Sequence, residues 1–238
     1  MEKLPEINII YEDNHLLVVE KPINIPVQED DSKDLDLITI IKCYLKDKYK
    51  KPGNVYLGMV HRLDRPVGGI MVFAKTSKAS SRLSEEIRKK EVKKKYYAVL
   101  CGCVKDSDVL RDYLVKDNKT NNSYVTTKDK GKEAILEYVR LDYMNNYSLV
   151  DVNLITGRSH QIRVQFASRG YPLYGDYRYN KKADMGSNIA LYAYMLEFTH
   201  PTLKKKMCFK LDMPNRYPFN LFKEKQLWNW IIMILKMN

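Results

Sequence analysis

The stretch that decides the fold is HRLDRPVGG at residues 61–69, which runs directly into the apolar segment IMVFA at residues 70–74. Within it, one acid stands between two arginines and close to a pair of glycines. That pattern suits a carboxylate that carries out chemistry on an anionic ligand, so Asp64 is the candidate nucleophile. The same residues are also compatible with a solvated turn whose charges pair with one another. The motif alone leaves both interpretations open.

The size and charge of the chain bound the class of protein. Its 238 residues, 45% of them apolar, are enough for a substantial core in one large domain or two closely packed halves. Lysine and arginine number 41 against 29 acids, a formal charge of +12. This excess favours a polyanionic partner, with nucleic acid first, although a protein that is merely basic is the alternative.

Two runs of basic residues concentrate this charge. Residues 88–95 read RKKEVKKK, six basic residues in eight, and residues 204–206 are three lysines. Such runs bind phosphate by releasing counterions and do not distinguish one base sequence from another. They therefore predict RNA or DNA binding without naming a target.

The cysteines and the amino-terminal residues indicate the compartment. Cys43, Cys101, Cys103 and Cys208 form no paired C-x-x-C framework and have no histidines at zinc spacing. We therefore expect reduced, mostly buried thiols and no metal site. The amino terminus does not resemble a secretion leader, and no apolar run approaches the roughly 18 residues that span a bilayer. These features predict a cytoplasmic protein without a membrane segment.

Apolar periodicity and turn residues predict the order of strands and helices. The expected elements are a strand, turn and strand over 7–21, a loop over 22–34, a helix over 37–49, a strand over 70–74, a helix over 78–90 capped by Ser77, a strand over 96–101, an antiparallel meander over 109–117, 123–128, 133–142 and 147–155, a helix over 160–169, and strands over 190–199 and 206–212. Asp64 then lies on a loop between a helix and a strand.

No repeat, linker or low-complexity segment divides the chain. We expect one catalytic domain over residues 1–222, followed by an apolar helical tail over residues 223–238. The tail is apolar on nearly every face, which predicts burial against the domain or against a partner. The oligomeric state is left open.

Five segments in order carry a resemblance to a known family. They are HRLDRPVGG at 61–69, IMVFAKT at 70–76, KKYYAV at 94–99, TGRSHQIRV at 156–164 and GDYRY at 175–179. With them, the chain resembles the RluA family of RNA pseudouridine synthases from about residue 11 to residue 214. EKP at 20–22 and THP at 199–201 are similar to the flanking segments of that family.

The resemblance implies a fold and an activity. The implied fold is α+β, a bent, mainly antiparallel mixed sheet flanked by helices with a central basic cleft. The implied activity is the isomerisation of uridine to pseudouridine in ribosomal or transfer RNA, without a cofactor or metal. Attack by the carboxylate on C1′ of the sugar and on C6 of the base both remain possible.

The resemblance also assigns roles to individual residues. It implies that Asp64 is the nucleophile, that Tyr96 lines the site against the target base, and that Arg163 pairs with the catalytic acid. Arg62 is implied to help open the RNA around a flipped nucleotide.

Three further residues of the TGRSHQIRV segment are expected to frame the substrate. They are Arg158, His160 and Gln161, although helix capping and core hydrogen bonds explain His160 and Gln161 equally well.

The chain departs from the family pattern at a few positions. Residues 67–69 read VGG where the family usually has Thr-Ser-Gly, so a hydroxyl is lost and the final glycine is kept. Asn24 and Asn180 stand where glycine is common. Asparagine tolerates positive φ, so both are compatible with the same backbone turns.

Other functions use similar residues. A nucleoside hydrolase or base glycosylase would use the same acid but admit water, and a non-catalytic RNA-binding or ribosome-assembly module would not need Asp64 at all. A metal-dependent nuclease is disfavoured because the motif has one acid beside arginines and lacks the clustered carboxylates of a magnesium site.

Overall fold

The computed structural model describes residues 5–184 and 186–223. The chain forms two compact units: unit 1 comprises Met1–Lys94 and Ala193–Leu211, and unit 2 comprises Lys95–Tyr192 and Asp212–Asn238. The predicted helical tail over residues 223–238 lies, apart from its first residue, outside the described residues.

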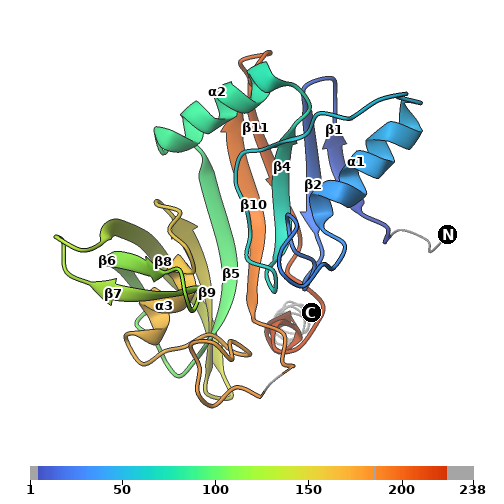
Figure 1. Cartoon of the computed structure of the whole chain (residues 1–238). Helices are drawn as coiled ribbons and strands as arrows, with labels where there is room; N and C mark the ends of the chain where they lie inside the picture. Colours follow the sequence, from blue (N-terminus) through green and yellow to red (C-terminus); the bar gives the residue numbers. More distant parts are fainter. Residues whose placement is uncertain (1–4, 185, 224–238) are drawn as a thin grey trace, which may run out of the picture. The chain divides into compact units, whose positions relative to one another are not determined.

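The order of elements follows the prediction closely (Figure 1). The helices are α1 (Leu37–Lys48), α2 (Ser77–Arg88) and α3 (Gln161–Ala167). The strands are β1 (Asn8–Glu12), β2 (Leu16–Lys21), β3 (Gly58–Met59), β4 (Gly68–Ala74), β5 (Lys93–Cys101), β6 (Ser107–Asp117), β7 (Asn122–Thr126), β8 (Lys132–Met144), β9 (Tyr147–Leu154), β10 (Leu191–Thr199) and β11 (Lys206–Lys210). The α+β class with a mainly antiparallel sheet is therefore confirmed.

In unit 1 the strands run in the order β1, β2, β4 and β10, with β3 on β4 and β11 on β10. Strand β2 is buried except for the half-buried Glu20, because α1 and α2 lie on its two faces. Leu16 and Val18 share a core with Ala79 and Leu83 of α2. Successive side chains of a strand point to opposite faces, so the alternate residues of β2 face α1.

The two helices of unit 1 begin where side chains can cap them. Asp36 caps α1, and Thr76 caps α2 by accepting a hydrogen bond from the Ala79 N–H at 3.2 Å. The prediction of Ser77 as the cap of α2 is thus wrong by one residue. Both residues carry a hydroxyl, and only Thr76 has the extended backbone that an N-cap needs.

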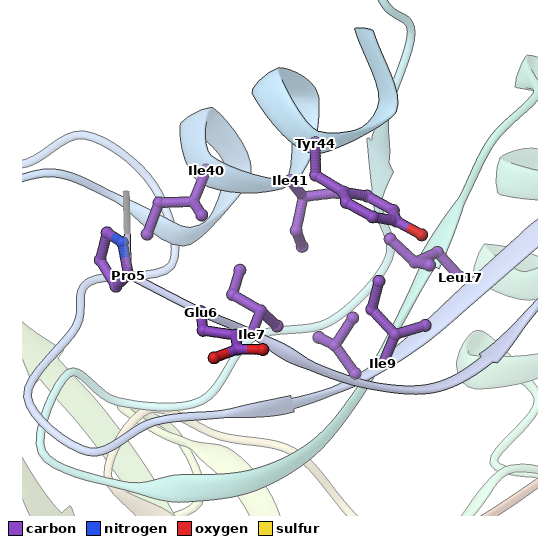
Figure 2. Close-up of a pocket in the computed structure, with 9 residues that line it drawn as sticks. Pro5, Glu6, Ile7, Ile9, Leu17, Ile40, Ile41 and Tyr44 are labelled. Atoms are coloured by element: carbon purple, nitrogen blue, oxygen red, sulfur yellow. The ribbon is translucent and has the colours of Figure 1, made fainter. Parts of the chain in front are cut away.

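A cavity of about 390 Å³ lies between α1 and the sheet of unit 1 (Figure 2). Its walls are mostly aliphatic, from Ile9 and Leu17 on the strands to Ile40 and Ile41 on the helix. None of the candidate site residues lines it. A largely apolar hollow without a basic group does not suit a phosphate-bearing ligand.

In unit 2 the strands run in the order β5, β9, β8, β6 and β7. The predicted meander is wrong in one connection, because β8 pairs with β6 and leaves β7 at the edge. Periodicity locates strands but does not decide which neighbours they pair with. Strand β6 is 11 residues long and β7 only 5, so β8 gains a longer ladder by pairing with β6 than it would on β7.

Helix α3 packs on one face of this sheet. Val164 of α3 forms a core with Leu114 of β6 and Ala134 of β8. The Phe166 ring lies edge-on to the Tyr138 ring, with centroids 5.1 Å apart. The helix ends at Ala167, two residues before its predicted end at residue 169, and Gly170 lies in the following turn with φ of +82°.

All four cysteines are free thiols, but the expectation that most are buried is wrong. Cys43, Cys103 and Cys208 are exposed, and Cys101 is half-buried. Cys43 lies on the outer side of α1, and Cys208 alternates with the inward side chains of β11. Free cysteine is usually buried, but here Cys43 and Cys208 occupy solvent-facing positions of α1 and β11 and are therefore exposed.

Candidate active-site residues

Asp64 lies on a loop that leads into β4, as predicted, but the loop begins after the short strand β3, which the sequence did not indicate. The Val67 N–H donates to the Asp64 carbonyl oxygen at 2.9 Å, which closes a turn around the motif. The Asp64 side chain is partly buried. The backbone of the turn therefore holds the carboxylate in a defined place.

A buried lysine donates hydrogen bonds to the backbone of this turn. Lys21, at the end of β2, is wholly buried, and its Nζ donates to the carbonyl oxygens of Pro22 at 2.8 Å, Arg65 at 2.9 Å and Val67 at 2.9 Å. An ammonium has three N–H donors, so each of them meets one acceptor. Two of the acceptors belong to the turn, and Lys21 thereby fixes the backbone immediately after Asp64.

Lys21 also contributes to the electrostatics of the site. Burial lowers the pKa of Lys21 to about 7, the Asp64 carboxylate raises it and Arg65 lowers it further. A titratable lysine beside a candidate nucleophile couples the charge of the turn to pH near neutrality.

The two arginines that flank Asp64 have different environments. Arg65 is engaged by an upstream loop, where it pairs with Asp34 and approaches Asp30 at 3.6 Å. Arg62 is exposed and makes no hydrogen bond or ion pair within residues 5–184 and 186–223. The interpretation that the charges of the motif pair with one another is therefore wrong. Arg62 remains available to a ligand.

His61 has a structural role. Its Nε2 accepts a hydrogen bond from the Val72 N–H at 3.1 Å, and burial lowers the pKa of His61 to about 3, with a further lowering from Lys94. A neutral imidazole of this kind ties the start of the motif to β4.

The two asparagines that stand where glycine is common in the family, Asn24 and Asn180, differ in backbone conformation. Asn24 has φ of +64°, the left-handed conformation for which asparagine substitutes for glycine. Asn180 does not have positive φ; its Nδ2 donates to the Leu173 carbonyl oxygen at 3.2 Å.

Tyr96 lies in β5 of unit 2 and is 6% exposed. It pairs in register with Val152, which in turn pairs with Tyr138. Residues in one register row of an antiparallel sheet share a face. Since Tyr138 contacts Phe166 of α3, Tyr96 lies on the face of unit 2 that carries α3.

Arg163 forms a bidentate ion pair inside unit 2. Its Nε lies 2.8 Å from Oδ2 of Asp176 and its Nη2 lies 2.7 Å from Oδ1. The Arg163 side chain is 4% exposed and that of Asp176 1%. The Arg163 guanidinium also lies 5.2 Å from the centre of the Tyr179 ring. The predicted partnership of Arg163 with Asp64 joins residues of different units and stays a prediction.

His160 precedes α3 with a left-handed backbone, φ +52°, and its side chain makes no cap hydrogen bond. Its Nδ1 lies 2.7 Å from the Tyr179 hydroxyl, which accepts a hydrogen bond from the Ser123 N–H at 2.8 Å. Helix capping therefore does not account for His160, which instead links α3 to the β6–β7 hairpin.

Gln161 uses its whole amide within the unit. Its Oε1 accepts from the Thr156 hydroxyl at 2.8 Å and the Arg158 N–H at 3.0 Å. Its Nε2 donates to the Ile135 carbonyl oxygen and to Gln165, both at 3.0 Å. Gln161 is 3% exposed, so it shapes the turn that presents Arg158.

Arg158 itself is exposed. Its Nε donates to the Glu133 carbonyl oxygen at 2.8 Å. The rest of the guanidinium makes no ion pair within the part of the chain that the structure describes, and it can reach a ligand.

The basic run at residues 88–95 is largely engaged by acids. Lys94 is the most enclosed of its cations, and burial lowers the pKa of Lys94. Four others form ion pairs: Arg88 and Lys89 with Glu85, Lys93 with Glu197 and Lys95 with Asp151. The lysines at 204–206 are exposed. The sequence run therefore overstates the free positive charge of this segment.

No group of three or more histidines, cysteines or acids that could hold a metal ion occurs among the described residues. Across residues 5–184 and 186–223, no helix combines the length and apolar character needed to span a bilayer.

Comparison with known proteins identifies the class of enzyme. The family model described as RNA pseudouridylate synthase matches residues 15–168. The chain belongs to this family and is an RNA pseudouridine synthase, an isomerase. The resemblance to the RluA family is thereby confirmed.

Individual relatives agree with this assignment. The chain is 33% identical to an uncharacterized RNA pseudouridine synthase of Aquifex aeolicus, over 97% of this chain and 74% of the relative. It is 32% identical to the dual-specificity RNA pseudouridine synthase RluA of Escherichia coli K12, over 87% of this chain and 93% of the relative. The solved structure of human RNA pseudouridylate synthase domain containing 4 aligns with a TM-score of 0.73 at 22% identity, over 87% of this chain and 89% of that one, and shares the fold.

Sequence reasoning assigned no role to three residues that organise the site. Lys21 was visible as a lysine at the end of an apolar strand, in EKP. Asp176 and Tyr179 were visible in GDYRY, but nothing local indicated that they surround Arg163.

Proposed function

We propose that this enzyme acts in the cytoplasm on a uridine of ribosomal or transfer RNA, with Asp64 as the covalent nucleophile. The observation that carries the proposal is the turn after β3, in which Lys21 holds the backbone beside a partly buried Asp64 while Arg62 stays unpaired. A fixed acid next to an available cation suits covalent chemistry on a nucleotide.

The reaction needs one nucleophile and no redox partner. The N1–C1′ glycosidic bond breaks, the uracil rotates, and C5 bonds to C1′. The hydrogen on C5 leaves as a proton, and N1 gains one, so atoms and electrons balance. Asp64 supplies the covalent bond to C1′ or to C6 during the rotation and leaves at the end.

Arg163 would keep the nucleophile ionised. A dry pocket prevents water from capturing the detached sugar, but it also favours a neutral acid. A guanidinium about 4 Å from the carboxylate, at an effective dielectric near 20, contributes on the order of 4 kcal/mol before desolvation is subtracted. If Arg163→Met keeps near-normal turnover, this role is wrong.

The remaining residues would bind the RNA. Tyr96 offers a ring for stacking on uracil and a hydroxyl for proton movement. Arg62 would fill the gap left by the flipped nucleotide, because a planar guanidinium recovers part of the stacking energy. Arg158 and His160 would frame the substrate, with Gln161 shaping their turn.

The test is a tritium-release assay. Total RNA labelled at uracil C5 is incubated with the wild-type chain, with Asp64→Asn and with the control Asp31→Asn, an exposed acid of the upstream loop. The wild type and the control are expected to release tritium. Asp64→Asn should lower the rate by at least about a thousandfold, about 4 kcal/mol in barrier, while it still binds RNA.

Other outcomes separate the alternatives. Release of free uracil would identify a hydrolase or glycosylase. RNA binding without tritium release from the wild type would identify a non-catalytic module. Sequencing the modified position would name the substrate RNA.

A further inference from the structure

Two lysines of unit 2 stand on the face that carries α3. Lys132 of β8 pairs in register with Leu114 of β6, and Lys116 lies two residues beyond Leu114 on the same strand. Residues two apart on a strand share a face, as do register partners. Leu114 contacts Val164 of α3, so both lysines face the α3 side, and both are exposed.

Two arginines reach the same end of the sheet. The Nη1 of Arg178 donates to the turn at residues 120–122, between β6 and β7, at 2.9 to 3.2 Å. Arg158 binds the carbonyl oxygen of Glu133, the residue next to Lys132. Lys116, Lys132, Arg158 and Arg178 are named the hairpin cluster.

The acids around the hairpin cluster do not neutralise it. The Asp117 carboxylate accepts from the Lys119 N–H and the Thr120 hydroxyl. The Glu133 carboxylate pairs with Arg111 at 2.7 Å. None of the four cations in the cluster forms an ion pair within residues 5–184 and 186–223. This contrasts with the run at 88–95, most of whose cations are paired.

The hairpin is also attached to the residues around Arg163. The Tyr179 hydroxyl accepts from the Ser123 N–H of β7, and the Tyr179 ring lies against the Arg163 guanidinium. Arg178 is the next residue along the chain. A ligand held by the hairpin cluster is therefore held close to the Arg163 end of unit 2.

We propose that the hairpin cluster binds consecutive phosphates of the substrate RNA strand. The inference rests on the proposed function and adds the main contact between unit 2 and the phosphate backbone of the RNA. The two basic runs of the sequence, at 88–95 and 204–206, did not indicate this place. Cations that form no ion pair and lie together at one end of a sheet bind a polyanion by counterion release, and arginine adds bidentate contacts to phosphate.

The test is the salt dependence of RNA binding. Fluorescence anisotropy with a labelled 20-nucleotide oligouridylate gives the affinity of the full chain over a salt series. Lys116→Ala/Lys132→Ala should reduce the slope of log affinity against log salt by about 1.4 and weaken binding about 25-fold at 0.1 M salt. Lys116→Arg/Lys132→Arg should keep the wild-type slope.

The matched control removes the same charge elsewhere. Lys42 and Lys46 are exposed on α1, and Lys42→Ala/Lys46→Ala should leave the slope within about 0.3 of the wild type. If both alanine pairs change the slope equally, or neither changes it, the hairpin cluster is not the phosphate site. Absence of tritium release from the wild type would overturn the proposed function instead, so the two failures are distinguishable.

Discussion

Arg163 and Asp176 form a buried two-point ion pair, Nε to Oδ2 at 2.8 Å and Nη2 to Oδ1 at 2.7 Å. Removing one member of a buried pair leaves the other charge without compensation. Asp176→Ala is therefore expected to lower the free energy of unfolding by about 3 to 5 kcal/mol, measured by urea denaturation.

The control for Asp176 is Asp129→Ala, an exposed acid of the same unit, which should change stability by less than about 0.5 kcal/mol. An unchanged urea midpoint for Asp176→Ala would show that the pair is not structurally required. In the proposed mechanism Asp176→Ala also releases the guanidinium, so the soluble fraction should lose turnover.

Lys21 predicts a pH dependence of stability. Its pKa is about 7 in the folded chain, whereas an unfolded lysine titrates near 10.5. Between these values the unfolded state holds the proton and the folded state does not, so unfolding takes up a proton and stability rises with pH. The wild type should therefore gain stability relative to Lys21→Met as pH rises from 7 to 9.5.

At pH 7, Lys21→Met leaves three buried carbonyl oxygens without their donor, and we expect a loss of about 2 to 4 kcal/mol. Denaturant titrations at several pH values measure both effects. A stability difference that does not vary from pH 7 to 9.5 would mean that Lys21 does not titrate in this range.

Glu12 predicts sensitivity to acid. Burial alone would raise the pKa of Glu12, but hydrogen bonds from Lys48, Lys75, Tyr49 and Tyr44 outweigh it and lower the pKa to about 2. A depressed carboxyl pKa contributes stability above the unfolded value near 4.5, and that contribution disappears as pH falls from 4.5 to 2.

Glu12→Gln should therefore cost about 1 to 2 kcal/mol at pH 7, a modest figure because water screens the outer part of this network. The variant and the wild type should converge only as pH falls to about 2. Glu29→Gln, on an exposed loop, is the control and should match the wild type throughout. A gap that does not narrow between pH 4.5 and pH 2 would contradict the assignment.

Gly69 is required by a close approach of two strands. It has φ of +124°, and a Cβ there would lie 2.2 Å from the Ala193 carbonyl oxygen of β10. Gly69→Ala is therefore expected to destabilise the chain by about 3 kcal/mol or more. Thermal unfolding of Gly69→Ala and of Gly53→Ala, where a Cβ meets no atom within 4 Å, gives the comparison. Equal melting temperatures for the two variants would contradict the requirement for glycine at position 69.

Local patterns predicted most of the fold. The strands at 7–21 and the helix at 37–49 appear within two residues of their predicted bounds because alternation and helical spacing are properties of neighbouring residues. The predicted cap of α2 was wrong by one residue because Thr76 and Ser77 both carry a hydroxyl that can cap a helix, and the sequence alone does not show which of them has the extended backbone. The pairing of β8 with β6 could not be predicted, because register partners are set by contacts distant in sequence.

In the candidate site, too, local motifs predicted some features and contacts distant in sequence decided the others. The HRLDR motif indicated Asp64 and its loop, and the family comparison confirmed the class of enzyme. The sequence could not show that Arg65 binds Asp34 while Arg62 stays unpaired, since the two arginines are chemically identical. Nor could it show that Lys21 supports the turn from a strand more than forty residues away.

By itself, then, the amino-acid sequence determined the order of elements, the basic character and the family of this enzyme, because each of these is encoded in residue types and their spacing. Only the tertiary structure decided which charged side chains are neutralised by ion pairs and which remain available to a ligand. The run at 88–95 is largely paired, whereas the hairpin cluster is not. The physical reason is that the free energy of a charge depends on its burial and its neighbours in space, and a chain acquires both only when it folds.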